Sequence, residues 1–155
     1  MKFLERIPLT LGSFFYVGYL PFIPGTFGSA AGMLLLYGVK GMLPLQLLLT
    51  FALTAVGFMV GTTCEKMLHT KDPRAVVIDE VSGIFISFIG VPWNLKTVIF
   101  GFFVFRLLDT IKPYPAGKLQ NLRGSTGIML DDIVAGVYTN LILQVVTRVA
   151  TFTIS

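Results

Sequence analysis

The chain has 155 residues, of which 54% are hydrophobic and only 13% are charged, and its mean hydropathy is +0.81. A water-soluble domain of this size needs more charge to cover its surface, so the composition excludes an ordinary soluble protein and indicates a membrane protein. Its length predicts a single domain over residues 1–155. The net charge of +4 comes from scattered basic residues without a dense run, so we expect no nucleic acid partner.

The N-terminal segment, residues 1–24, combines apolar residues with several interruptions. Glu5, Pro8, Pro21 and Pro24 break up its hydrophobic stretches. A signal peptide needs an unbroken apolar centre, which this segment lacks. We therefore predict that residues 1–24 are retained and lie at the membrane surface.

Five hydrophobic segments follow in chain order. They cover about Thr26–Val39, Leu43–Thr63, Asp79–Val91, Leu95–Ile111 and Leu130–Thr151. A full membrane crossing takes about 20 residues in a helix, so the first, third and fourth segments are short for one. The pattern predicts an all-α, polytopic membrane bundle of four to five hydrophobic helices. The short helices would pack inside the bundle or thin the bilayer locally.

Charged residues fall mostly on one side of this zigzag, together with the N-terminus and the polar stretches Glu65–Ile78 and Lys112–Thr126. Nine of the 12 basic residues lie on that side, which the positive-inside rule makes cytoplasmic. We therefore expect a multi-pass membrane protein with its N-terminus on the cytoplasmic side. All eight acidic residues fall on the same side. Topology does not require this acidic bias, so it needs a chemical explanation.

Two acidic doublets, Asp79-Glu80 and Asp131-Asp132, each lie at the start of a predicted hydrophobic segment. One acid per helix is explained by the attraction between a carboxylate and a helix N-terminus, but a second adjacent acid adds repulsion. A hard divalent cation such as Mg²⁺ would relieve that repulsion. The doublets therefore predict a metal site made by two helices. Small residues follow each doublet by one turn and would allow close approach: Ser82 and Gly83, then Ala135 and Gly136.

Basic residues near the acids are candidates for phosphate binding. Arg106 and Asp109 are three residues apart on one helix face, so they form either a local ion pair or a phosphate clamp beside a metal ligand or base. Lys112 and Arg123 flank a proline-rich turn and would either attract a phosphomonoester or extend to the membrane edge.

The stretch Pro24–Ser29 opens the first hydrophobic segment with the hydroxyls of Thr26 and Ser29. Free N–H groups at a helix start bind phosphate, although either hydroxyl alone can serve as an ordinary helix cap. Two GxxxG pairs indicate tight helix packing. The pairs are Gly28/Gly32 and Gly57/Gly61. His69 is the only histidine, which argues against a histidine-based phosphatase.

Four blocks of this sequence, taken in order, resemble the signature blocks of the phosphatidylglycerophosphatase A family. The blocks are Pro24–Ser29, Ile78–Gly83, Phe105–Pro115 and Gly127–Gly136. The resemblance implies an all-α fold and a Mg²⁺-dependent lipid phosphatase that acts in phosphatidylglycerol synthesis. Its substrate would be phosphatidylglycerophosphate, cleaved to phosphatidylglycerol and phosphate at the cytoplasmic face.

The resemblance also implies which residues form the site. Its candidate catalytic acids are Asp79, Glu80, Asp109, Asp131 and Asp132, and the two doublets among them are the candidate metal ligands. The candidate phosphate contacts are Thr26, Ser29, Arg106, Lys112 and Arg123. Two alternatives remain open at this point. One is an enzyme like the CDP-alcohol phosphotransferases, although their longer signature is absent, and the other is a small divalent-cation transporter. The sequence makes no prediction of the oligomeric state.

Overall fold

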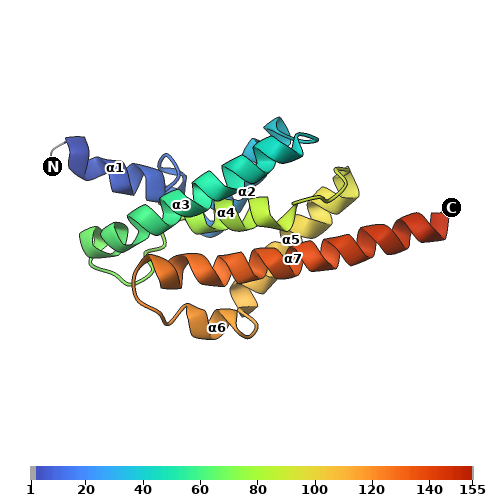
Figure 1. Ribbon diagram of the computed structural model, residues 1–155. Coiled ribbons are helices and arrows are strands. Elements are labelled where there is room, and N and C mark those ends of the chain that lie inside the picture. The colour runs from blue at the N-terminus through green and yellow to red at the C-terminus, as the bar shows by residue number, and fades with distance from the viewer. Residues whose placement is uncertain (1–2, 155) are drawn as a thin grey trace.

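The computed structural model describes residues 3–154, and every regular element in that range is a helix (Figure 1). The predicted all-α class is confirmed. Residues 1–2, which belong to the predicted surface segment, lie outside the described range, as does Ser155. The elements are α1 (Phe3–Gly12), the 3₁₀ helix η1 (Val17–Tyr19), α2 (Pro24–Gly38), α3 (Leu43–Leu68), α4 (Ile78–Ser87), α5 (Leu95–Ile111), α6 (Ala116–Leu119) and α7 (Ser125–Ile154).

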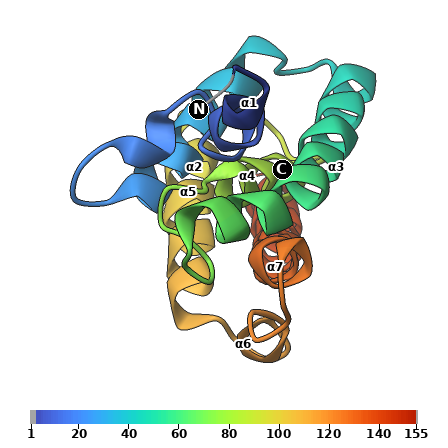
Figure 2. The ribbon, with the colours of Figure 1, turned by 90° about the vertical axis from the view of Figure 1, so that its left-hand side faces the viewer.

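The short helix α4 lies at the centre of the bundle, with α2, α3, α5 and α7 around it (Figure 2). Its apolar residues are almost fully buried. Ile84 and Phe85 join Leu36, Phe105 and Leu143 in the main hydrophobic core. The third hydrophobic segment is therefore a helix enclosed by the others, which is one of the two outcomes expected for a segment too short to cross a membrane.

Helix α4 ends inside the bundle, and side chains of α7 satisfy carbonyl groups at its last residue and just after it. The Asn140 amide donates hydrogen bonds to the carbonyl oxygens of Ser87 (3.1 Å) and Ile89 (2.9 Å). The Gln144 amide donates to the Ile89 carbonyl as well, at 3.2 Å. A carbonyl group without a hydrogen-bond donor costs free energy when it is shielded from water. These two amides therefore allow α4 to end inside the bundle.

Both glycine pairs are packing positions, as predicted. A Cβ atom added to Gly28 would lie 2.7 Å from the Val77 side chain, and one added to Gly57 would lie 2.3 Å from the Met129 sulfur. These distances are too short for any side chain. Glycine therefore allows α2 to approach the start of α4, and α3 to approach α7.

Two helices, α3 over Leu43–Leu68 and α7 over Ser125–Val149, are long and apolar enough to cross a membrane. In α3 only 22% of the most apolar stretch is buried inside the protein, so most of that surface faces outward. Helices α2, α4 and α5 have 15, 10 and 17 residues and are shorter than a full crossing. The predicted count of four to five membrane helices is thus supported for two.

Two predicted helix boundaries are wrong, and both errors arise where α3 meets α7. Helix α3 continues past Thr63 to Leu68, and α7 begins at Ser125 rather than at Leu130. The Ser125 N–H donates to the Thr62 hydroxyl at 3.0 Å, and the Gly124 N–H donates to the Glu65 carboxylate at 3.0 Å. Side chains of α3 therefore satisfy the first N–H groups of α7, a long-range interaction that hydropathy does not reveal.

Helices α1 and α6 lie at the end of the bundle where the chain starts (Figure 1). Helix α1 packs on α3, and the Val77 N–H donates to the Gly12 carbonyl at 2.9 Å. The predicted surface segment is thus partly helical and is attached to the residue before α4. The short α6 was not predicted from the sequence. It lies below α7 at this same end of the molecule (Figures 1 and 2).

Candidate active site

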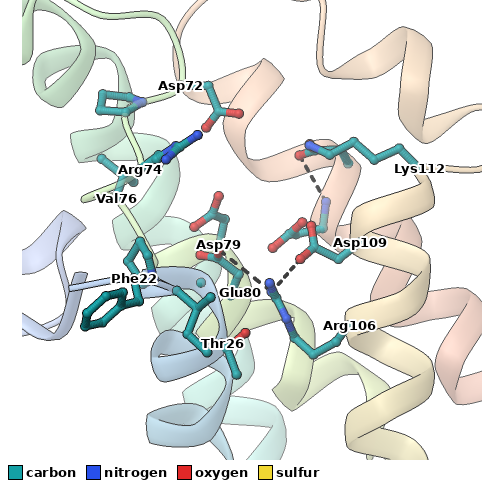
Figure 3. Close-up of a pocket in the computed structure, with 16 residues that line it drawn as sticks. Phe22, Thr26, Asp72, Arg74, Val76, Asp79, Glu80, Arg106, Asp109 and Lys112 are labelled. Carbon is teal, nitrogen blue, oxygen red and sulfur yellow. Dashed lines mark hydrogen bonds and ion pairs between the residues drawn. The ribbon is translucent and has the colours of Figure 1, made fainter. Parts of the chain in front are cut away.

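A pocket of about 370 Å³ lies where α2 and α4 begin and α5 ends (Figure 3). Its walls combine backbone of the first turn of α2 with an unusual concentration of charged side chains. The charged residues that line it are Asp72, Arg74, Asp79, Glu80, Arg106, Asp109, Lys112, Asp131 and Asp132. Of the eight acids in the chain, six thus share one pocket.

Three of these acids form a compact cluster. Asp79 and Glu80 from the first turn of α4, and Asp132 from α7, each offer one carboxylate oxygen, and these oxygens lie within 4.8 Å of one another. Among the described residues, Asp79 Oδ1, Glu80 Oε2 and Asp132 Oδ2 are buried without a hydrogen-bond partner. Buried carboxylates are costly unless a cation or donor compensates them. Their oxygen donors and close spacing fit a hard divalent cation such as Mg²⁺.

The two helices that carry the cluster approach closely because glycines face each other one turn further along. A Cβ atom added to Gly136 would lie 2.7 Å from the backbone oxygen of Gly83. Gly83 follows Asp79 by one helical turn, and Gly136 follows Asp132 by one turn, so the contact places the acids side by side. The predicted role of the small residues after the doublets is confirmed.

The buried environment changes the acidity of the α4 doublet. Burial raises the pKa of Asp79 well above its usual range, and the nearby charges of Glu80 and Asp132 raise it further. Burial also raises the pKa of Glu80 to about 7. Burial thus disfavours the ionised forms of both carboxyl groups, and a bound cation would favour them.

Asp131 does not join the cluster, although its doublet partner does. Adjacent helix residues point about 100° apart, and the Asp131 carboxylate instead pairs with the Lys112 ammonium. Burial lowers the pKa of Lys112, but the hydrogen bond to Asp131 and the negative charges of the nearby aspartates together outweigh burial and leave the pKa raised. The doublet also lies well inside α7 rather than at its start, so the helix-cap explanation does not apply to Asp131 or Asp132.

Arg106 connects three helices at the floor of the pocket. Its guanidinium pairs with Asp109 on α5 and lies 4.0 Å from the Glu80 carboxylate of α4 (Figure 3). It also donates to the Ser29 hydroxyl of α2 at 3.3 Å. The sequence left open whether Arg106 and Asp109 form a local ion pair or a phosphate site. The ion pair is present, and it faces the pocket.

The remaining predicted phosphate contacts divide between inside and outside the pocket. Thr26 lines it at the start of α2. Ser29 is buried behind it, where its hydroxyl donates to the Gly25 carbonyl and accepts from Arg106. Arg123 lies in a different pocket with Lys66, so the structure does not bring it to the acids.

Two charged residues of the pocket, Asp72 and Arg74, were not predicted from the sequence. They lie in the connection between α3 and α4, beside Pro73, and reach the pocket opposite Lys112 (Figure 3). Their nearness in sequence to Asp79 was the only available signal, and a single sequence does not show which way a loop turns.

Gly25 sits where α2 touches the pocket, and its replacement tests this geometry. A Cβ atom there would lie 2.3 Å from Glu80 Oε1 and 3.1 Å from Arg106 Nη2. We expect Gly25→Ala to lower the activity of this site about 10-fold, because groups that act on a substrate tolerate little displacement. Gly38→Ala is the matched control on the same helix, since a Cβ atom there meets nothing within 4 Å. Equal activities of the two variants, measured as phosphate release, would contradict the close approach of Gly25 to the site.

The bundle has two helices of membrane-spanning length, and its pocket combines carboxylates with an arginine and a lysine. Together these features define a class of membrane proteins that can bind a phosphate group. Comparison with known proteins identifies the family. A sequence model described as phosphatidylglycerophosphatase A matches residues 10–147. The chain therefore belongs to the phosphatidylglycerophosphatase A family, a family of phosphatases, as the signature blocks predicted.

Several bacterial relatives are similar over most of their length. A Bacteroides thetaiotaomicron protein with the provisional name phosphatidylinositol-3-phosphatase is 34% identical, over 94% of this chain and 96% of its own. The Escherichia coli phosphatidylglycerophosphatase A is 37% identical, over 81% and 75% of the two chains. The Haemophilus influenzae phosphatidylglycerophosphatase A is 32% identical, over 77% and 76%. No solved structure matches the chain significantly.

Proposed function

We propose that this protein is a Mg²⁺-dependent phosphatase that hydrolyses phosphatidylglycerophosphate to phosphatidylglycerol and phosphate at the cytoplasmic face of the bacterial inner membrane. The family and two of the named relatives support the reaction. The observation that carries the mechanism is the cluster of three carboxylates with unpartnered buried oxygens, next to the guanidinium of Arg106.

Asp79, Glu80 and Asp132 are the residues that would hold the metal. When bound there, Mg²⁺ would supply positive charge to the phosphoryl oxygens and lower the pKa of a water molecule. Among the described residues, the one ion pair to these three carboxylates is that of Arg106, 4.0 Å from Glu80. Their role is to fix the position of positive charge beside the phosphate.

Arg106 and Lys112 would bind the phosphoryl oxygens and stabilise the charge that develops on them. Each cation is already held by an aspartate of the pocket, Arg106 by Asp109 and Lys112 by Asp131. These pairs hold both cations at the end of α5, on one side of the pocket (Figure 3). The Thr26 hydroxyl and the first turn of α2 offer further donors to the phosphate.

The hydrolysis itself requires one proton transfer. Water attacks phosphorus, the bond from phosphorus to the substrate alcohol oxygen breaks, and the proton lost by water must reach a base. We assign Asp109 to this role because it lines the pocket without belonging to the carboxylate cluster. Either this proton or one from solvent neutralises the alcohol that leaves.

The proposed cytoplasmic location rests on the distribution of charge. The pocket lies at the end of the bundle that holds α1, α6 and the polar connections 69–77 and 112–124 (Figure 1). That end carries most of the basic residues, which favours a cytoplasmic position. Phosphate would then be released into the cytoplasm while the lipid remains in the membrane.

The alternatives left open by the sequence receive less support. A cation transporter requires acids along a path through the bundle, but six of the eight acids line one pocket at one end. A phosphotransferase of the CDP-alcohol type is not supported by the family. The Bacteroides relative favours a second candidate function, removal of phosphate from a 3-phosphorylated phosphoinositide. Both candidate substrates present a phosphomonoester on a polyol headgroup.

The deciding experiment measures phosphate release from purified protein in detergent micelles. Phosphatidylglycerophosphate, phosphatidylinositol 3-phosphate and phosphatidic acid are compared at equal surface concentration. We expect the first to be hydrolysed fastest, EDTA to abolish the activity, and added Mg²⁺ to restore it. Faster hydrolysis of the phosphoinositide would establish the second candidate, and full activity in EDTA would contradict the metal assignment.

A further inference from the structure

An apolar groove of about 620 Å³ runs along the outside of the bundle between α2 and α5. Side chains at helical spacing form its two walls. On α2 these are Ala30, Met33, Leu34 and Tyr37, and on α5 they are Leu95, Val98, Ile99, Phe102 and Phe103. Several of them are exposed; for example, Leu34 and Leu95 are each 74% exposed. The groove is a concave, open and largely apolar surface, and the polar side-chain groups of its lining residues are the Tyr37 hydroxyl and the Trp93 indole N–H.

The groove continues directly from the candidate active site. Thr26 lies one turn before Ala30 on α2, and Arg106 lies one turn after Phe102 on α5, so both belong to the helical faces that form the groove walls. Both residues line the acidic pocket. The hydrogen bond from Arg106 to Ser29 joins the two helices at the junction between pocket and groove.

The groove is long enough to hold most of one lipid chain. Its walls run from Ala30 to Tyr37 on α2 and from Leu95 to Phe103 on α5, which at 1.5 Å per residue corresponds to about 10 Å and about 12 Å. One leaflet of hydrocarbon is about 15 Å thick, half of a bilayer core. Tyr37 and Trp93, with ring centroids 6.2 Å apart, close the end of the groove away from the pocket.

We infer that this groove binds one acyl chain of the phospholipid substrate and thereby holds the phosphomonoester over the carboxylate cluster. The inference rests on the proposed function, since it assigns a second contact region to the same substrate. In a lipid with its phosphomonoester in the pocket, the acyl chains are attached at the far end of the headgroup, and the groove is the apolar surface next to the pocket on the same two helices. Binding energy from the remote chain would thus be used to position the reacting phosphate.

The test compares substrates that fill the groove with substrates that do not reach into it. Phosphatidylglycerophosphate with acyl chains of sixteen carbons is compared with the same lipid bearing chains of six carbons, in one detergent. Ala30→Trp places a large side chain at the mouth of the groove. Ala52→Trp is the matched control, because Ala52 is an exposed alanine on α3, outside the groove.

We expect the wild-type protein to have the higher kcat/KM on the long-chain substrate. Ala30→Trp should lower the ratio of long-chain to short-chain kcat/KM about 10-fold while the short-chain value stays within about twofold, since steric blocking of one pocket has effects of this size. Leu34→Trp, one turn deeper, should show the same selective loss and serves if the first variant does not fold.

Each other outcome is decisive. An unchanged ratio in both groove variants, or an equal loss on both substrates, would overturn the acyl-chain site. Loss of a dimer in micelles on Ala30→Trp, with an unchanged ratio, would show that a second copy of the chain covers the groove instead. Absence of wild-type activity on both substrates would contradict the proposed function itself, which separates that failure from failure of the groove.

Discussion

Asp132→Asn is expected to lower phosphate release more than about 1,000-fold and to leave the bundle folded. Asp132 contributes one of the three clustered oxygens and is 2% exposed. Loss of about 4 kcal/mol of charge stabilisation corresponds to this factor, and metal ions typically supply several kcal/mol. Asp79→Asn should behave in the same way, because Asp79 provides the matching oxygen from α4. Steady-state phosphate release in micelles measures the loss.

A second measurement separates a lost metal site from a damaged fold. Asparagine has the shape of aspartate, and it removes a buried charge, so melting temperatures in EDTA should stay equal to wild type or rise. Added Mg²⁺ should raise the melting temperature of the wild-type protein and not that of Asp132→Asn. Asp131→Asn is the matched variant, since Asp131 is adjacent but pairs with Lys112, and it should keep the Mg²⁺-dependent shift. A shift retained by Asp132→Asn would show that the cluster is not the metal site.

Arg106→Lys is expected to lower kcat/KM about 100-fold, a loss comparable to removal of one donor to a developing oxyanion. Lysine keeps the positive charge but cannot reproduce the planar guanidinium, which contacts Asp109, Glu80 and Ser29 at once. The loss should appear in kcat as well as in KM, because the proposed contact strengthens as charge develops on the phosphoryl oxygens.

Arg123→Lys tests whether position or residue type explains that loss. Arg123 lies at the same end of the molecule but lines a separate pocket with Lys66 and Lys71. Its conservative replacement should change activity less than about twofold, as is usual for exposed sites remote from the chemistry. A comparable loss in both variants would restore the sequence-based prediction that Arg123 binds phosphate, and it would show that the two pockets act together.

Helix α4 illustrates how far local patterns predict this fold. The hydrophobic segment and the turn signal at Pro92 indicated a helix near residues 79–91, and the structure places it at Ile78–Ser87. Its central position and its end within the bundle depend on Asn140 and Gln144, which lie on α7 far along the chain. No local pattern marks these amides as partners of the Ile89 carbonyl.

The acidic site shows the same division. The doublets were recognisable because adjacent acids beside apolar segments are costly without a partner. The structure separates the four acids, since Asp79, Glu80 and Asp132 form the cluster while Asp131 pairs with Lys112. Successive residues of a helix point about 100° apart, so Asp131 and Asp132 face different neighbours. Which of the two faces α4 depends on how α7 packs in the tertiary structure.

The sequence by itself determined the membrane character, the helical class, the family and most members of the acidic site. These depend on composition, on hydrophobic segment length and on short blocks of residues, all of which are local along the chain. Only the tertiary structure decided which carboxylate oxygens converge, that Asp72 and Arg74 enter the pocket, and that Arg123 does not. Such outcomes depend on how closely the helices approach. Glycines such as Gly83 and Gly136 permit that approach, but their effect depends on the residue opposite each of them.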